Sequence, residues 1–117
     1  MQLVKFFSGY PDLIGRRQAF VGVFQGPASY SATASATQIT GGGDTLIIPG
    51  YEKYIDSISE ISIDPTGTYF GIGLPSIAGP RPTWKIFYFN AATGAVITAQ
   101  TNLSTYNFIV SGFMGEY

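Results

Sequence analysis

Hydrophobic and polar residues alternate along this 117-residue chain in short segments that glycine and proline separate. The segments are rich in Val, Ile, Phe and Tyr, whose β-branched or aromatic side chains fit a pleated, half-buried strand. No segment keeps the 3.6-residue period of an amphipathic helix. The Ser/Thr/Ala-rich residues 29–40 fit either an exposed edge strand or an ordered loop. Elsewhere the pattern predicts strands at residues 18–24, 45–48, 54–64, 68–74, 84–89, 95–99 and 106–114.

The segment from Trp84 to Phe89 holds the only tryptophan of the chain together with further aromatic residues. Successive side chains of a strand point to opposite faces. One face therefore carries Trp84, Ile86 and Tyr88, and the other carries Lys85, Phe87 and Phe89. A strand with water on one face would alternate apolar with polar residues. We therefore expect a central strand that is covered on both faces, with Phe87 and Phe89 facing a second sheet, the N-terminal arm or another subunit.

In residues 54–64 the patterns of a helix and of a strand compete. Asp56, Glu60 and Asp64 recur every four residues, as on one face of a helix. The isoleucines do not keep that period, and Ile with Ser forms helices poorly. As a strand, the segment places the acidic residues on one solvated face and the isoleucines on the other. Ile58 alone is out of phase, which a β-bulge would explain.

Residues Asp64 to Gly67 form a strong turn signal, with Asp at the first position, Pro at the second and Gly at the fourth. We expect the chain to return antiparallel after this turn, so that residues 68–74 form a hairpin with the strand before it. The whole pattern predicts an all-β fold: an antiparallel β-sandwich of seven to eight strands, Greek-key or jelly-roll-like. Residues 1–17 form an extended N-terminal arm and residues 18–117 the sandwich domain.

The composition predicts a surface with few charged residues. Charged residues make up 11% of the chain, against about 25% in soluble domains. Such a surface fits a protein that is covered by neighbours in an assembly. The alternative is a monomer coated with uncharged polar residues. A net charge of −1 argues against binding nucleic acid or anionic membrane through bulk electrostatics.

The residues offer no convincing site for catalysis, a cofactor or a metal. The chain lacks cysteine and histidine, which removes thiolate chemistry and the usual general base. The acidic residues of 54–64 lie about 13 Å apart along a strand, too far to share one cation. Gly41 to Asp44 lacks the Lys-Ser/Thr of a phosphate-binding loop and is interpreted as a flexible turn. We expect a protein that is not an enzyme.

Four tyrosines near turns leave a second function open, which is carbohydrate binding by stacking on their rings. The simpler interpretation is that these rings cover the ends of the core. The tyrosines are Tyr30, Tyr51, Tyr54 and Tyr69.

The chain resembles small structural proteins of tailed bacteriophage virions, of the capsid decoration (cement) type. The resemblance covers about residues 18–114 and is carried by the turns and strands of three stretches: residues 42–49, residues 81–95 and residues 102–106. It implies a non-enzymatic protein on the capsid exterior that binds the major capsid protein and clusters as a homo-oligomer, with a trimer favoured over a dimer. The alternative is a carbohydrate- or receptor-binding module of a phage tail or fibre.

The contacts with these partners are expected to come from aromatic residues beside a surface that is poor in charge. Isolated arginines next to turns either add contacts with acidic groups of a partner or are plain surface charges. The expected interface residues are Phe6, Phe7, Tyr10, Arg16, Arg17, Phe87 and Phe89.

Overall fold

The computed structural model describes residues 1–7, 12–14, 17–34, 39–49, 55–75, 83–97 and 100–115, and these residues contain no helix. Seven of the described strands have four residues or more. They are β1 (Gln2–Phe6), β3 (Arg17–Gln25), β5 (Ile39–Gly42), β7 (Ile55–Ile61), β8 (Tyr69–Pro75), β9 (Trp84–Asn90) and β10 (Asn107–Gly115). The shorter strands are β2 (Asp12–Ile14), β4 (Ala32–Ala34) and β6 (Asp44–Thr45). The predicted all-β class is confirmed.

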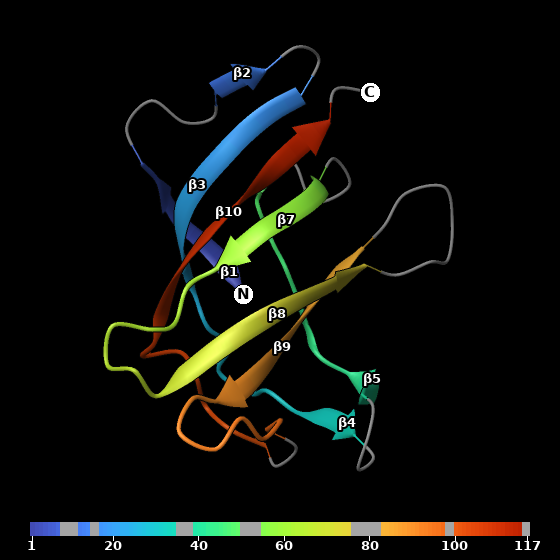
Figure 1. Cartoon of the computed structure of the whole chain (residues 1–117), viewed down its shortest axis with the longest axis vertical. Helices are drawn as coiled ribbons and strands as arrows, with labels where there is room; N and C mark the ends of the chain where they lie inside the picture. Colours follow the sequence, from blue (N-terminus) through green and yellow to red (C-terminus); the bar gives the residue numbers. More distant parts are fainter. Residues whose placement is uncertain are drawn as a thin grey trace.

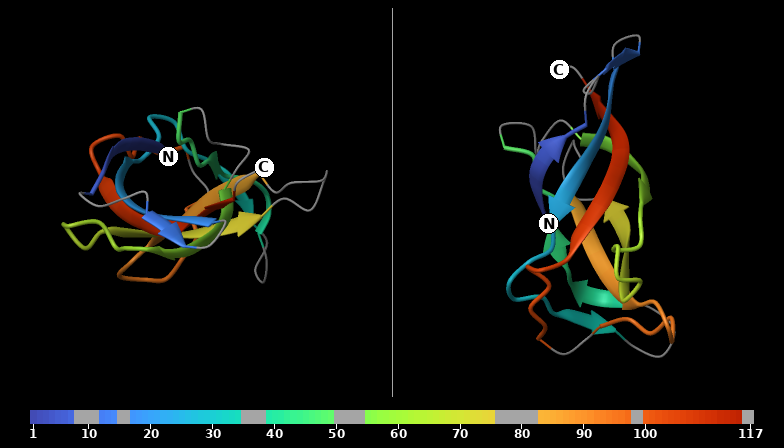
Figure 2. Two further views of the ribbon diagram at one scale, coloured as in Figure 1. Left: turned by 90° about the horizontal axis from the view of Figure 1, so that it is seen from above. Right: turned by 90° about the vertical axis from the view of Figure 1, so that its left-hand side faces the viewer.

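Two antiparallel sheets form the layers of a β-sandwich (Figure 1). The larger sheet has the strand order β1-β3-β10-β7, with β2 pairing on β3, and the smaller has the order β6-β9-β8. The hairpin of β4 and β5 lies at one end of the sandwich. Seen from above, the strands curve around a shared interior (Figure 2). The core between the sheets includes Phe20, Phe24, Tyr88 and Phe108, all of them fully buried.

The N-terminal segment is part of the larger sheet. β1 pairs antiparallel with β3, and β2 pairs with another stretch of the same strand. Ile47, just after β6, forms a parallel bridge with Gln2. The Leu3 amide donates to the carbonyl oxygen of Ile47 at 3.0 Å, and the Ile47 amide donates to that of Met1 at 2.8 Å. The two sheets are therefore joined by backbone hydrogen bonds along this side of the sandwich.

On the opposite side, β7 and β8 come together without pairing. β7 pairs with β10 and β8 pairs with β9, so the predicted hairpin of residues 54–64 with 68–74 is wrong. The glycines of β8 explain the arrangement, because they leave space for side chains from β7. A Cβ on Gly73 would meet the Cδ1 of Ile58 at 2.8 Å, and one on Gly71 would meet the Cγ2 of Ile61 at 3.3 Å. Side chains packed on backbone take the place of a hydrogen-bonded ladder here.

The predicted bulge in β7 is confirmed. The register of β7 against β10 shifts twice, once on each side of Ile58. Each shift adds a residue to β7 that has no partner opposite, which brings Ile55, Ile58 and Ile61 to the same inner face. Ile55 is buried, and the other two pack against the core. Ile63 lies beyond the strand and is exposed, contrary to the expectation that it shares the buried face.

The turn after β7 forms as predicted, and Asp64 holds it in place. The Gly67 amide donates to the carbonyl oxygen of Asp64 at 2.9 Å, and Gly67 has a φ of 73°. The Asp64 carboxylate accepts hydrogen bonds from the backbone amides of Thr66, Thr68 and Tyr69 and from the Thr66 hydroxyl. Asp64 is therefore a buried residue that caps the turn, and its predicted place on a solvated acidic face is wrong.

Candidate functional site

The strand β9 is central in its sheet and covered on both faces, as the sequence predicts. Ile86 and Tyr88 are fully buried between the sheets. On the other face Phe87 is only 6% exposed. Gly43, with a φ of 98°, lies over this ring, since a Cβ on Gly43 would meet two ring carbons of Phe87 at 2.9 Å. The chain itself therefore buries Phe87, and this residue is removed from the expected set of interface residues.

The outer face of β8 and β9 is nevertheless apolar, and the residues that make it so come mainly from β8. Residues directly opposite each other on neighbouring strands share a face, so Phe70 lies beside Phe89 and Ile72 beside Phe87. The rings of Phe70 and Phe89 stack at 5.1 Å with an interplanar angle of 10°. Ile72 is 45% exposed, although it lies in the middle of a regular strand. Leu74, next along this face, is also exposed.

In β8 the usual orientation of a strand, with large apolar side chains toward the core, is reversed. β8 turns its large side chains Phe70, Ile72 and Leu74 outward and its glycines inward. Exposed single hydrophobic residues are ordinary, whereas a contiguous row on one sheet face marks an interaction site. We call the outer-facing residues Phe70, Ile72, Leu74 and Phe89 the β8–β9 face.

One cation stands at the end of the β8–β9 face. Lys85 lies opposite Leu74 on one side and Thr45 on the other. Its Nζ donates a hydrogen bond to the Thr45 hydroxyl at 2.7 Å, and it has no ion pair among the described residues. The face therefore presents aromatic and aliphatic side chains with a positive charge at one end.

The other expected interface residues fall in different places. Phe6 points inward, where its ring meets Phe20 edge-on at 6.4 Å, and Phe7 is 36% exposed. Tyr10 and Arg16 lie outside the described residues. Arg17 begins β3, and its side chain is likewise outside the described part. The structure does not place Phe6 on one surface with Phe87 and Phe89, since Phe6 points into the core and the other two lie on the outer face of β9.

The tyrosines that suggested carbohydrate binding do not form a stacking platform where they are described. Tyr30 is buried, and its ring meets Tyr88 edge-on at 4.9 Å. Tyr69 packs against the core and meets Tyr106 edge-on at 4.9 Å. Both rings therefore cover the ends of the core, which is the simpler of the two interpretations. Tyr51 and Tyr54 lie outside the described residues.

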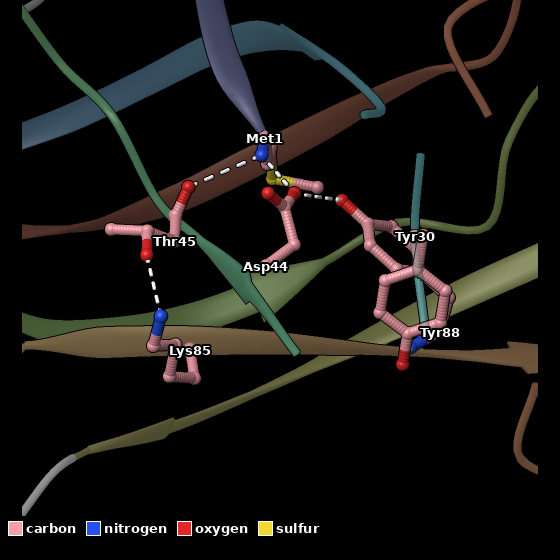
Figure 3. Close-up of polar contacts among 6 residues, drawn as sticks. All are labelled: Met1, Tyr30, Asp44, Thr45, Lys85 and Tyr88. Carbon is pink, nitrogen blue, oxygen red and sulfur yellow. Dashed lines mark hydrogen bonds and ion pairs between the residues drawn. The ribbon is translucent and has the colours of Figure 1, made fainter. Parts of the chain in front are cut away.

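A polar cluster that the sequence did not reveal surrounds Asp44 (Figure 3). The amino group of Met1 forms an ion pair with the Asp44 carboxylate and also donates to the carbonyl oxygen of Thr45 at 3.2 Å. The Tyr88 hydroxyl donates to the same carboxylate at 3.1 Å. The Tyr30 hydroxyl accepts from the Tyr88 backbone amide at 3.1 Å. The cluster ties the start of β1 to β6 and β9 and therefore connects the two sheets.

Burial controls the ionisation of this cluster. It lowers the pKa of the Met1 amino group below its usual 8.0, although the hydrogen bond and charge of Asp44 act in the opposite direction. Burial also raises the pKa of Tyr88, and the negative charge of Asp44 raises it further. Burial raises the pKa of Tyr30 as well, so both tyrosine hydroxyls of the cluster favour the neutral, hydrogen-bonding form.

A hollow of about 310 Å³ opens beside the cluster, with Met1, Gln25, Asp44 and Ser104 on its walls. Its polar groups already bond one another, since the Gln25 amide donates to the carbonyl oxygen of Ser104 at 2.7 Å. Among the described residues, no group of three or more acidic, His or Cys side chains is placed to hold a metal ion. The described part of the chain also has no helix with the length and apolar character to cross a membrane.

Comparisons with known proteins identify no relative of this chain: no family model, no curated protein sequence and no solved structure matches it. The β8–β9 face is therefore the strongest candidate for a functional site on structural grounds alone. The alternation of Phe70, Ile72 and Leu74 with Gly71 and Gly73 is visible in the sequence and is the signal that points to it.

Proposed function

We propose that this chain is a non-enzymatic structural protein of the phage capsid decoration type, which attaches to the major capsid protein and reinforces the shell. The observation that carries the proposal is the β8–β9 face, whose Ile72 and Leu74 are 45% and 43% exposed on the outer face of the edge strand β8. The resemblance of residues 42–49, 81–95 and 102–106 to virion proteins supplies the partner.

Attachment through this face gains free energy from burial of apolar surface, at about 25 cal/mol per Å² before the costs of association. The seven-residue strands β8 and β9 and the two-residue strand β6 give the three-stranded sheet a flat area of about 250 Å², at roughly 3.3 Å per residue and 4.8 Å per strand. A standard interface buries about 800 Å² on each partner. The contact made by one copy is therefore smaller than a standard interface, and we expect weak, concentration-dependent binding.

The test is co-sedimentation of the purified protein with empty capsids of the virus that encodes it. The double variant Ile72→Ser/Leu74→Ser removes apolar surface without a change in the core, and we expect it to remain in the supernatant. The matched control is Val4→Ser, since Val4 is 56% exposed but lies on β1, in the other sheet. The control variant should sediment with the capsids as the unmodified chain does. Equal sedimentation of the double variant and the control would overturn the proposal.

A further inference from the structure

The outer face of the larger sheet is apolar along its two central strands. Phe20 and Phe24 of β3 are buried, so Val21 and Val23 point outward. On β10 the inner residues are Phe108 and Val110, which places Ile109 outward, and it is 45% exposed.

These outward residues form one continuous patch. Ile109 lies directly opposite Val23, and Ser111 lies opposite Val21. On the two central strands, the described stretches from Ala19 to Val23 and from Asn107 to Phe113 contain no charged residue. We call Val21, Val23 and Ile109 the β3–β10 face.

Opposite charges stand on the two sides of this face. Lys5 of β1 lies opposite Val23, and Glu60 of β7 lies opposite Ser111, so both point outward. Both are exposed, and neither forms an ion pair among the described residues. The strands β3 and β10 separate them, which at roughly 4.8 Å per strand places them about 14 Å apart. They are therefore too far from each other to pair within one chain.

We propose that the β3–β10 face is a dimer interface that binds a second copy of this chain about a two-fold axis parallel to the strands. Such an axis lies in the plane of contact and carries each side of the face onto the opposite side of the partner. Val23 of each copy packs against Ile109 of the other, and Val21 lies over Ser111, as the inner faces of a sandwich pack. Lys5 of each copy meets Glu60 of the other, and the two ion pairs lie at the rim.

The geometry of the face supports this partner. Lys5 and Glu60 lie one row of side chains apart along the strands, an offset of about 7 Å that a long lysine side chain can span. Strands of up to nine residues across the order β1-β3-β10-β7 give a flat area of about 500 Å², from the same strand dimensions. This area is larger than that of the β8–β9 face and therefore closer to the roughly 800 Å² that each partner buries in a standard interface. Complementary charges at the rim fix the orientation of the two copies more than they add affinity.

This inference gives a geometry to the homo-oligomer that the resemblance to virion proteins implies, as a dimer in place of the favoured trimer, and it uses the sheet opposite the β8–β9 face. A dimer formed in this way leaves Ile72 and Leu74 of both copies free. Self-association and attachment to a capsid are therefore separate properties, and each can fail without the other.

The test measures the dissociation constant of the purified chain by sedimentation velocity over a wide concentration range. Lys5→Glu and Glu60→Lys each place like charges against each other at both rim contacts, so either change should weaken the dimer about tenfold. The double variant Lys5→Glu/Glu60→Lys restores opposite charges and should return the dissociation constant to that of the unmodified chain. Ile109→Lys places an unpaired charge in the centre of the face and should give a monomer. Ile72→Lys, on the opposite sheet, should leave the dimer unchanged.

Recovery in the double variant, together with a monomeric Ile109→Lys, would establish the interface. Two results would overturn it: a wild-type chain that stays monomeric at every concentration, or a double variant that is no tighter than either single variant. Circular dichroism of each variant shows whether the fold is intact, and all four substituted positions are exposed. Capsid co-sedimentation of Ile109→Lys separates this inference from the proposed function, since attachment through the β8–β9 face does not need Ile109.

Discussion

The indole of Trp84 donates a hydrogen bond to the carbonyl oxygen of Ile55 at 3.0 Å, and this bond links the two sheets where their edge strands do not pair. Trp84 belongs to β9 of the smaller sheet and Ile55 to β7 of the larger one. At the other end of the same edge, the Asp64 amide donates to the carbonyl oxygen of Tyr69 at 3.0 Å. The open side of the sandwich is therefore held at both ends, with side chains packed on glycine between them.

Replacement of Trp84 by Phe tests the first of these links. The ring keeps its packing against the core, but the Ile55 carbonyl loses its donor. We expect the free energy of unfolding to fall by about 1–2 kcal/mol, since a buried acceptor without a partner costs about that much. Urea unfolding followed by circular dichroism measures the change, because the substitution removes the only tryptophan fluorophore. Val4→Ala, at an exposed position, is the control and should shift the midpoint by less than about 0.5 kcal/mol.

The Asp44 cluster predicts a stability that depends on pH in a specific direction. Burial places the pKa of the Met1 amino group in the folded chain below its usual 8.0. The unfolded chain therefore binds this proton more readily, and stability rises with pH through the window below 8.0. Asp44→Asn removes the charge that favours the ammonium form, so it should lower this pKa further and steepen the rise.

The same substitution should cost about 2–3 kcal/mol at pH 7. This is less than the 3–5 kcal/mol for a fully buried pair, because the Asp44 side chain is 15% exposed. Well above pH 8 the amino group is neutral in the unmodified chain as well, so the cost should shrink. Urea unfolding at several pH values measures both effects. A cost that stays constant from pH 6 to pH 10 would show that the ion pair contributes nothing to stability.

Asp64 predicts a loss of stability in acid. Burial alone raises the pKa of this carboxyl group, but the hydrogen bonds from Thr66, Tyr69 and Thr68 together hold it below its usual 3.8. The folded chain thus favours the carboxylate, and the stability gained is present above pH 3.8 and lost as pH falls through the lower pKa of the folded state. Asp64→Ala should lower stability by about 1–3 kcal/mol at neutral pH, because three backbone amides lose their acceptor. Its stability should then change less between pH 5 and pH 2 than that of the unmodified chain, which acid titration followed by circular dichroism checks.

The sequence predicts the local parts of this fold well, because their causes are local. The alternation in Gln18 to Phe24 and the aromatic density of Trp84 to Phe89 are enough to define β3 and β9. The phase of Ile58 predicts a bulge because the period of a strand is two, so one residue out of step needs one extra residue. The turn at Asp64 forms through side-chain bonds to amides two to five residues away.

The sequence predicts poorly the features that depend on distant contacts. The turn at Asp64 reverses the chain, but it does not decide whether β8 joins the sheet of β7 or the opposite one. That choice depends on Ile58 and Ile61, which fill the space over Gly73 and Gly71. The partner of Asp44 is Met1, 43 residues away, so no local sequence pattern predicts the ion pair. The outward row of β8 is visible as an alternation, but the rule that large apolar residues point inward predicts the opposite face.

Substitution of two glycines by alanine should have different costs, because one glycine faces the backbone of the neighbouring strand and the other faces a side chain that can move. A Cβ on Gly112 would lie 2.2 Å from the Ser57 carbonyl oxygen and 3.0 Å from a ring carbon of Phe20. The carbonyl oxygen belongs to the neighbouring backbone of β7 and cannot move without disturbing the β7–β10 register, so Gly112→Ala should cost about 3 kcal/mol or more. In Gly73→Ala the nearest atom to the new Cβ is the terminal methyl of Ile58, at 2.8 Å, and a rotation of that side chain relieves the contact; Ile86 Cδ1 lies at 3.4 Å, an ordinary van der Waals distance. We expect Gly73→Ala to change stability by less than about 1 kcal/mol, since a methyl in a strand also restricts the unfolded chain. Chemical unfolding of both variants measures the difference, and equal costs would contradict the packing described between β7 and β8.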